Sequence, residues 1–379
     1  MESKNVAYLE RLDHIRFFAA ALVLIFHTYL AVYQNPRVTP DPFRIPLIEQ
    51  GHTGVPLFMV ISGMILTIIV AGKEISVLNF YKNRVLRIYP LFAFMVTLGY
   101  FATPDPRPTS QGIDYLLALL PISNLYRLQY GAFGGHLWSI AVELQFYILF
   151  PLIISLRVRY GAKYLLGSIA ALVLLRAGVF RATGSVHGLA FFSIFGNLDI
   201  FLVGMLVGEL YLACREKTYW WNNAAAVVSL LFVINAALYI AFRPSSFFHV
   251  DYHHRSPTGI SNSALWIIWP TLQAVAWGAF VLMYLGGRGR VPMSAFLSRC
   301  GKCSYSMYVW HLFIIHLLPS RLVENMTPYT TGIFVVLPVT LAISAVSYHL
   351  IEEPFFSLRA RYVESRKPTI VADALRAAA

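Results

Sequence analysis

The chain has 379 residues, of which 58% are hydrophobic and only 13% are charged, and its mean hydropathy is +0.62. This composition excludes an ordinary soluble enzyme, a disordered chain and a secreted disulfide scaffold. Its 30 Lys and Arg outnumber 18 Asp and Glu, and in so apolar a chain we assign this excess to cytoplasmic loops and expect no nucleic acid partner.

The sequence predicts an all-α, polytopic membrane protein. A membrane-spanning helix needs about 20 mainly apolar residues, and ten segments qualify: 12–33, 54–72, 88–103, 136–155, 164–180, 189–213, 220–242, 263–286, 303–319 and 329–351. The first lacks a clear small-x-small cleavage site, so we interpret it as a retained helix and not as a signal peptide. Segment 113–125 is short and interrupted by Pro121, which indicates an interfacial or re-entrant piece.

The distribution of basic residues predicts the orientation. With ten spans, 21 of the 30 Lys and Arg fall on the side that holds both termini, so we expect both termini to be cytoplasmic. Residues 1–355 are predicted to form one transmembrane domain and residues 356–379 a basic cytoplasmic tail, with no appended soluble domain.

Ionisable side chains within a span are costly, so each is a functional hypothesis. Arg16 and His27 are eleven residues apart, which places them on one helix face about 16 Å apart. The predicted depths of His27 and Glu143 match, and a carboxylate beside an imidazole would orient a general base. The alternative is that both side chains only pack against neighbouring helices. The remaining such residues are Asp199, Glu209, His311, His316 and His349.

A second basic group precedes the third predicted span, in a segment that we interpret as an inner loop. Lys82, Arg84 and Arg87 lie there. Arg84 and Arg87 are three residues apart and would form a fork for phosphate if the segment were helical. The alternative is the ordinary positive charge of an inner loop, just as Arg16 could be a membrane anchor.

Two groups of residues could in principle bind a metal, but we predict a metal site at neither of them. Cys300 and Cys303 form a single CxxC with no second pair nearby, which indicates free thiols. A predicted outer loop carries four further residues, His249, Asp251, His253 and His254, without helical or strand spacing.

Six short motifs, in order, resemble the membrane-bound acyltransferase family 3, which O-acylates sugars, polysaccharides and some secondary metabolites. They lie at Leu12–His27, Gly54–Gly63, Arg84–Pro90, His136–Tyr147, Ser304–His311 and Glu352–Phe355. One departure is Pro56, where the family often carries Asp; this favours Glu143 as the partner of His27.

The resemblance implies transfer of an acyl group, most commonly acetyl, from cytoplasmic acyl-CoA to a hydroxyl group, in a bacterial cytoplasmic membrane. Such a reaction needs a base and donors that stabilise an oxyanion. We expect a channel between the helices, with the acceptor entering through outer loops 34–53, 104–135 and 243–262. The expected roles are catalysis for His27 and Glu143; binding of CoA for Arg16, Arg84, Arg87 and His311; and contact with the acceptor or the oxyanion for Ser139, Tyr147 and Trp138.

Several alternatives remain open at this point. The acceptor is expected to be a sugar of a surface polysaccharide, lipopolysaccharide or lipid-linked glycan, or else a glycosylated small metabolite such as a macrolide. A secondary transporter would also have ten helices and a few buried charges, but no internal repeat is visible. A non-catalytic lipid-binding relative would not need Arg16, His27 and Glu143 together. Direct transfer, an acyl-histidine intermediate and oligomerisation all remain possible.

Overall fold

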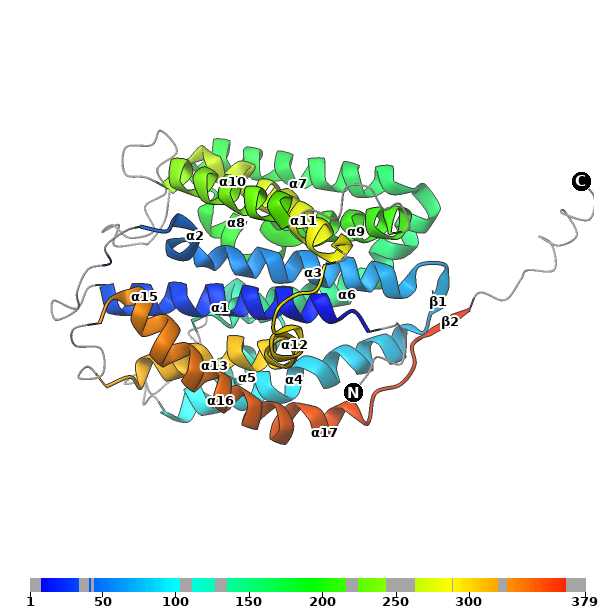
Figure 1. Ribbon diagram of the computed structural model, residues 1–379. Helices are drawn as coiled ribbons and strands as arrows, with labels where there is room; N and C mark the ends of the chain where they lie inside the picture. The colour runs from blue at the N-terminus through cyan, green and yellow to red at the C-terminus, as the bar shows by residue number, and fades with distance from the viewer. Residues whose placement is uncertain are drawn as a thin grey trace, which may run out of the picture.

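The computed structural model describes residues 8–33, 41, 44–102, 111–126, 135–215, 224–242, 263–287, 289–319 and 326–365. Its helices run roughly parallel or antiparallel in one bundle (Figure 1). Seven helical segments in the described part are long and apolar enough to cross a membrane. The all-α, polytopic membrane fold is therefore confirmed, while the count of ten spans and the cytoplasmic termini remain predictions.

The helices of the first half follow the predicted spans, with one shift. They are α1 (Glu10–Tyr33), α2 (Pro46–Glu49), η1 (Gly51–Thr53), α3 (Gly54–Val70), α4 (Val77–Ala102), α5 (Gln111–Leu119), η2 (Ser123–Tyr126), α6 (Trp138–Tyr160) and α7 (Ala162–Thr183). The expected inner loop before residue 88 is wrong, because α4 already begins at Val77 and continues through Pro90. Arg84 and Arg87 therefore lie on a helix.

The second half contains shorter pieces. They are α8 (His187–Phe192), α9 (Ile194–Cys214), α10 (Ala224–Phe242), η3 (Ala264–Ile267), α11 (Trp269–Gly286), α12 (Ser294–Lys302), α13 (Ser304–His316), α15 (Pro328–Thr331), η4 (Gly332–Val336), α16 (Leu337–Ser347), η5 (Tyr348–Glu352) and α17 (Glu353–Phe356). The last five form one span, Pro328–Phe356, with two π-helical turns. Strands β1 (Lys73–Ile75) and β2 (Val363–Ser365) pair antiparallel.

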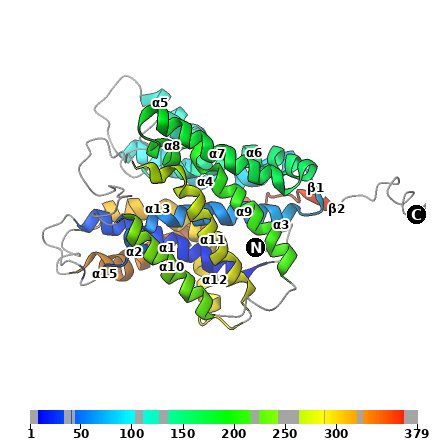
Figure 2. The same ribbon diagram turned by 90° about the horizontal axis from the view of Figure 1, so that it is seen from above.

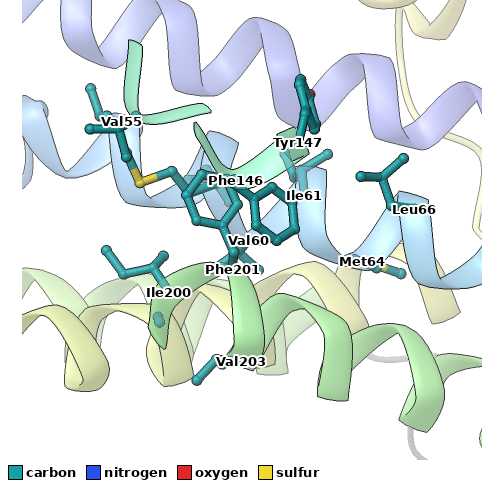
Figure 3. Close-up of a cluster of buried hydrophobic side chains, with 14 of the residues drawn as sticks. Val55, Val60, Ile61, Met64, Leu66, Phe146, Tyr147, Ile200, Phe201 and Val203 are labelled. Carbon is teal, nitrogen blue, oxygen red and sulfur yellow. The ribbon is translucent and has the colours of Figure 1, made fainter. Parts of the chain in front are cut away.

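Close packing in the centre depends on small residues. A Cβ atom on Gly63 of α3 would lie 2.2 Å from the carbonyl oxygen of Phe201, and one on Gly204 of α9 would lie 2.3 Å from that of Val60. Glycine therefore lets α3 and α9 meet backbone to backbone, as is common between membrane helices. Beside this contact, the rings of Phe146 and Phe201 stack with centroids 4.1 Å apart, whereas the Tyr147 side chain stands apart from that stack (Figure 3).

Two of the charged residues within spans have structural partners. Asp199 of α9 accepts hydrogen bonds from Arg176 of α7, with Nη2 and Oδ2 2.7 Å apart and both side chains fully buried. Glu209 pairs with Arg157 at 2.5 Å. Breaking such a buried pair leaves an uncompensated charge. Asp199 also accepts a hydrogen bond from Thr271 of α11, so we infer that it connects α9 to both α7 and α11. Figure 2 shows α9 beside these two helices.

Candidate active site

A cavity of about 110 Å³ lies among α1, α3, α4, α6 and α13. Its lining contains arginines, one carboxylate, hydroxyl groups and apolar side chains. These residues are Arg16, Val55, Phe58, Met59, Ile61, Ser62, Ile65, Leu66, Arg84, Arg87, Ile88, Ser139, Ile140, Glu143, Tyr147, Ser304, Tyr305 and Tyr308. The structure thus brings together six of the nine predicted site residues, from three separate helices.

The arginines of the cavity differ in how they are held. Arg16 donates to Asp13 at 3.0 Å, so part of its charge is balanced. The guanidinium of Arg84 lies between aromatic rings, with its carbon 5.4 Å from the Tyr147 ring centroid and 5.8 Å from that of Tyr362. Arg87 lies one helical turn further on α4. In the described part of the chain, no carboxylate oxygen lies within 4.0 Å of Arg84 or Arg87. Two guanidinium groups are therefore available to an anion.

The carboxylate of Glu143 lies in the same cavity. Its Oε1 accepts hydrogen bonds from Ser62 at 2.8 Å and from Tyr147 at 2.5 Å. Tyr147 is one turn further along α6, and Ser62 comes from α3. These bonds fix the carboxylate against the cavity wall.

Hydroxyl groups gather where α6 and α13 meet. Ser139 and Tyr308 share a hydrogen bond of 2.6 Å, and the Tyr308 hydroxyl lies 2.9 Å from the carbonyl oxygen of His136. Both side chains line the cavity. The Ser139 hydroxyl also lies 3.2 Å from the His136 carbonyl oxygen, so each hydroxyl hydrogen already has an acceptor in this wall. Either group would have to release that acceptor in order to donate to a developing oxyanion.

Three histidines lie together behind these hydroxyls. The ring centroids of His27 and His311 are 4.9 Å apart, and those of His136 and His311 are 4.7 Å apart. His136 and His311 are buried, whereas His27 is partly exposed. Their rings come from α1, α13 and the residues just before α6.

The expected pairing of Glu143 with His27 is not formed. The Nδ1 atom of His27 lies 3.0 Å from the Val23 carbonyl oxygen and 3.1 Å from Nε2 of His311. Glu143 instead binds the hydroxyls described above. Equal depth places two residues at one level of the membrane but does not fix the direction in which each side chain points, and here the two side chains have different partners.

The backbone partners indicate the tautomers of the pair. A ring nitrogen can bond to a carbonyl oxygen only if it carries a hydrogen. Because Nδ1 of His27 bonds to the Val23 carbonyl oxygen, we assign the hydrogen to Nδ1 and a free lone pair to Nε2. Likewise, Nδ1 of His311 donates to the Tyr308 carbonyl oxygen at 2.5 Å. The Nε2 atom of His311 is then an acceptor for the His27 N–H. This arrangement orients His27 as a neutral base.

The remaining residues predicted from the sequence do not line the cavity or lie outside the described part of the chain. His311 contacts His27 and is not part of the cavity lining. Trp138 packs on Phe191 and Phe192 with centroids 5.0 and 5.2 Å apart, also outside that lining. The loop with His249, Asp251, His253 and His254 falls outside the described residues. Among those that are described, no group of three or more His, Cys, Asp or Glu could hold a metal.

Sequence reasoning missed some residues of the site. Ser62, His136 and Tyr308 all lie within the motifs quoted above, and Tyr305 does as well. The signal that could have found them is a polar side chain inside an otherwise apolar motif, because such groups need partners in a membrane.

Comparisons with known proteins indicate the family of this chain. A model of an acyltransferase domain family matches residues 9–349. The chain is 25% identical, over 92% of its length, to an O-acetyltransferase OatA of Staphylococcus aureus, of which it covers 57%. It is also 25% identical, over 93% of its length, to a putative O-acetyltransferase of the same species, of which it covers 58%. The chain thus spans less than two thirds of these relatives, and no solved structure matches it. Because the family model extends over nearly the whole chain, this protein belongs to the membrane-bound acyltransferase family 3.

Proposed function

We propose that the protein is a membrane O-acetyltransferase that moves an acetyl group from acyl-CoA to a hydroxyl of a sugar or glycan. The observation that carries this proposal is a cavity lined by guanidinium groups, with a cluster of histidines next to its Ser139–Tyr308 wall. Phosphates of CoA match the guanidinium groups of Arg16, Arg84 and Arg87. The relatives named as O-acetyltransferases support the acetyl group.

The reaction follows from the orientation of His27. Nε2 takes the proton of the acceptor hydroxyl while the oxygen forms a bond to the thioester carbonyl carbon. The negative charge on the carbonyl oxygen is stabilised by hydroxyl donors, for which Ser139 and Tyr308 are the candidates. The C–S bond then breaks, and Nε2 of His27 gives its proton to the departing sulfur, so that CoA leaves as the thiol and the histidine is neutral again. A route through an acyl-histidine would use the same Nε2 atom.

The cytoplasmic side is the source of acyl-CoA, so the arginines should lie near that surface. About 16 Å of helix separates Arg16 from His27, which is comparable to the length of the pantetheine arm. A CoA held by its phosphates would thus present the thioester toward the histidines. The acceptor would then approach His27 from the other side of the membrane.

Purified protein in detergent or nanodiscs tests the proposal with radiolabelled acetyl-CoA. We expect the wild type to release CoA or to become labelled, and His27→Ala to bind acetyl-CoA without doing either. His316→Ala is the matched control, since His316 lies on α13 with an exposed side chain. Equal turnover by wild type and His27→Ala would contradict the role of His27, and a wild type that does not bind CoA would contradict the donor.

A further inference from the structure

The segment after the last helix folds back onto the bundle. We refer to residues 357–365 as the C-terminal strap. The side-chain amide of Asn83 on α4 donates to the carbonyl oxygen of Ala360 at 2.6 Å and accepts from its N–H at 2.9 Å. The N–H of Ser76 donates to the carbonyl oxygen of Tyr362 at 2.9 Å. Strand β2 then pairs with β1, next to the start of α4 (Figure 1).

The strap contributes directly to the surroundings of the cavity arginines. Tyr362, only 1% exposed, packs on Phe80 with ring centroids 5.5 Å apart and forms one side of the aromatic cage around Arg84. A segment surrounded only by solvent would not bury a tyrosine in this way. The strap therefore holds a fixed position beside one end of the cavity.

The strap also brings a further guanidinium group to this place. Arg359 stacks on the Phe356 ring, with its guanidinium carbon 3.5 Å from the ring centroid. Arg87, which lines the cavity, lies over the same ring at 5.7 Å. Two guanidinium groups thus lie over one aromatic ring, and the guanidinium group of Arg84 is within electrostatic range of Arg359.

Gathering like charges in a partly buried place is unfavourable. Burial, together with the guanidinium groups of Arg87 and Arg84, lowers the pKa of Arg359 to about 9. One buried carboxylate, Glu352, lies within electrostatic range of Arg87 and Arg359 and accepts a hydrogen bond from Ser306. Near Arg84 the corresponding carboxylate is Glu143. The three guanidinium groups of Arg84, Arg87 and Arg359 thus lie within electrostatic range of one another, and a bound phosphate would reduce the repulsion among them.

We propose that the C-terminal strap is part of the donor site, and that Arg359 joins Arg84 and Arg87 in binding a phosphate group of acyl-CoA. This inference rests on the proposed function, since it takes acyl-CoA as the donor. Arg359 is a binding residue here and takes no part in the chemical step. Phe356 sets the spacing of Arg87 and Arg359, and the hydrogen bonds from Asn83 set the position of the strap.

The strap offers its own control for a test. Arg361 lies two residues beyond Arg359 and has an exposed side chain, whose Nε donates to the Val363 carbonyl oxygen at 3.0 Å. Arg359→Gln keeps a side-chain stem over Phe356 but removes the charge, and Arg361→Gln removes an equal charge from the same strap. Arg359→Lys retains the charge without the fork. Thermal unfolding in detergent identifies any variant that fails to fold.

Binding of CoA, dephospho-CoA and pantetheine is measured for each variant. We expect Arg359→Gln to bind CoA roughly tenfold to a hundredfold more weakly, as loss of a charged hydrogen bond implies. Arg359→Lys should recover part of the loss, and Arg361→Gln should bind like the wild type. If Arg359→Gln weakens the binding of dephospho-CoA as well, Arg359 binds the pyrophosphate. If it weakens the binding of CoA alone, Arg359 binds the 3′-phosphate. Binding of pantetheine should be unchanged in both cases.

Three results would overturn the inference. In the first, Arg359→Gln binds CoA like the wild type. In the second, Arg361→Gln weakens the binding of CoA as much as Arg359→Gln does. In the third, Arg359→Gln weakens the binding of pantetheine as much as that of CoA, which would indicate a general distortion of the site. In each of these cases CoA still binds the wild type, so the proposed function survives. A wild type that binds none of the three ligands would overturn both proposals together.

Discussion

The contact between His311 and His27 gives a graded prediction for the rate of acetyl transfer. The N–H of His27 has two acceptors, the Val23 carbonyl oxygen at 3.0 Å and Nε2 of His311 at 3.1 Å. Replacing His311 by Leu removes one of them and leaves the backbone acceptor. One net hydrogen bond contributes about 1 kcal/mol, so we expect kcat to fall roughly fivefold. Loss of a general base itself costs roughly 100-fold to 10,000-fold.

The conservative variant makes this prediction specific. In His311→Gln the amide oxygen can take the place of Nε2 and accept from the His27 N–H, so kcat should stay near that of the wild type. Release of CoA from acetyl-CoA, measured at saturating acceptor, gives kcat and KM for the wild type, His311→Leu, His311→Gln and His27→Ala. KM for acetyl-CoA should not change, because His311 is not among the residues that line the cavity. The reasoning fails if His311→Leu is as inactive as His27→Ala, or if His311→Gln is no better than His311→Leu.

Three further predictions concern other parts of the molecule. Arg87→Ala should raise KM for acetyl-CoA about tenfold, as loss of one charged contact implies, with little change in kcat; a fall in kcat alone would contradict its role in binding. Asp199→Asn should destabilise the fold by about 3–5 kcal/mol in thermal or denaturant unfolding, because Arg176 is left buried and charged; replacing both residues by Leu and Met should recover most of the loss, and no recovery would argue against this explanation. Gly63→Leu should abolish a monodisperse peak in size-exclusion chromatography, because its Cβ would lie 2.2 Å from the Phe201 carbonyl oxygen; a normal peak would contradict the tight contact between α3 and α9.

The membrane class and the rough positions of the helices were accessible from the sequence, because apolar length is a local property. The gathering of Arg16, Arg84 and Arg87 on one cavity could also be expected, since the charge pattern placed the arginines on one side of the membrane. Family motifs then named residues that the structure brings within one site.

Other features depend on tertiary contacts that no local pattern encodes. The partner of His27 is determined by how α13 packs on α1, so depth along the membrane could not distinguish His311 from Glu143. The helical start of α4 was missed because Lys82, Arg84 and Arg87 were interpreted as residues of an inner loop, although a helix can begin before its apolar run. The strap was missed because basic residues after an apolar span are typical of a solvated tail.

The most direct test of the account is a cryo-electron microscopy structure of the protein with a non-hydrolysable acetyl-CoA analogue. We expect the phosphates to contact Arg84 and Arg87, and the acetyl group to lie at the Ser139–Tyr308 end of the cavity, beside the histidine cluster. Density for the analogue outside this cavity, or with its acyl end directed away from His27, would contradict the central claim.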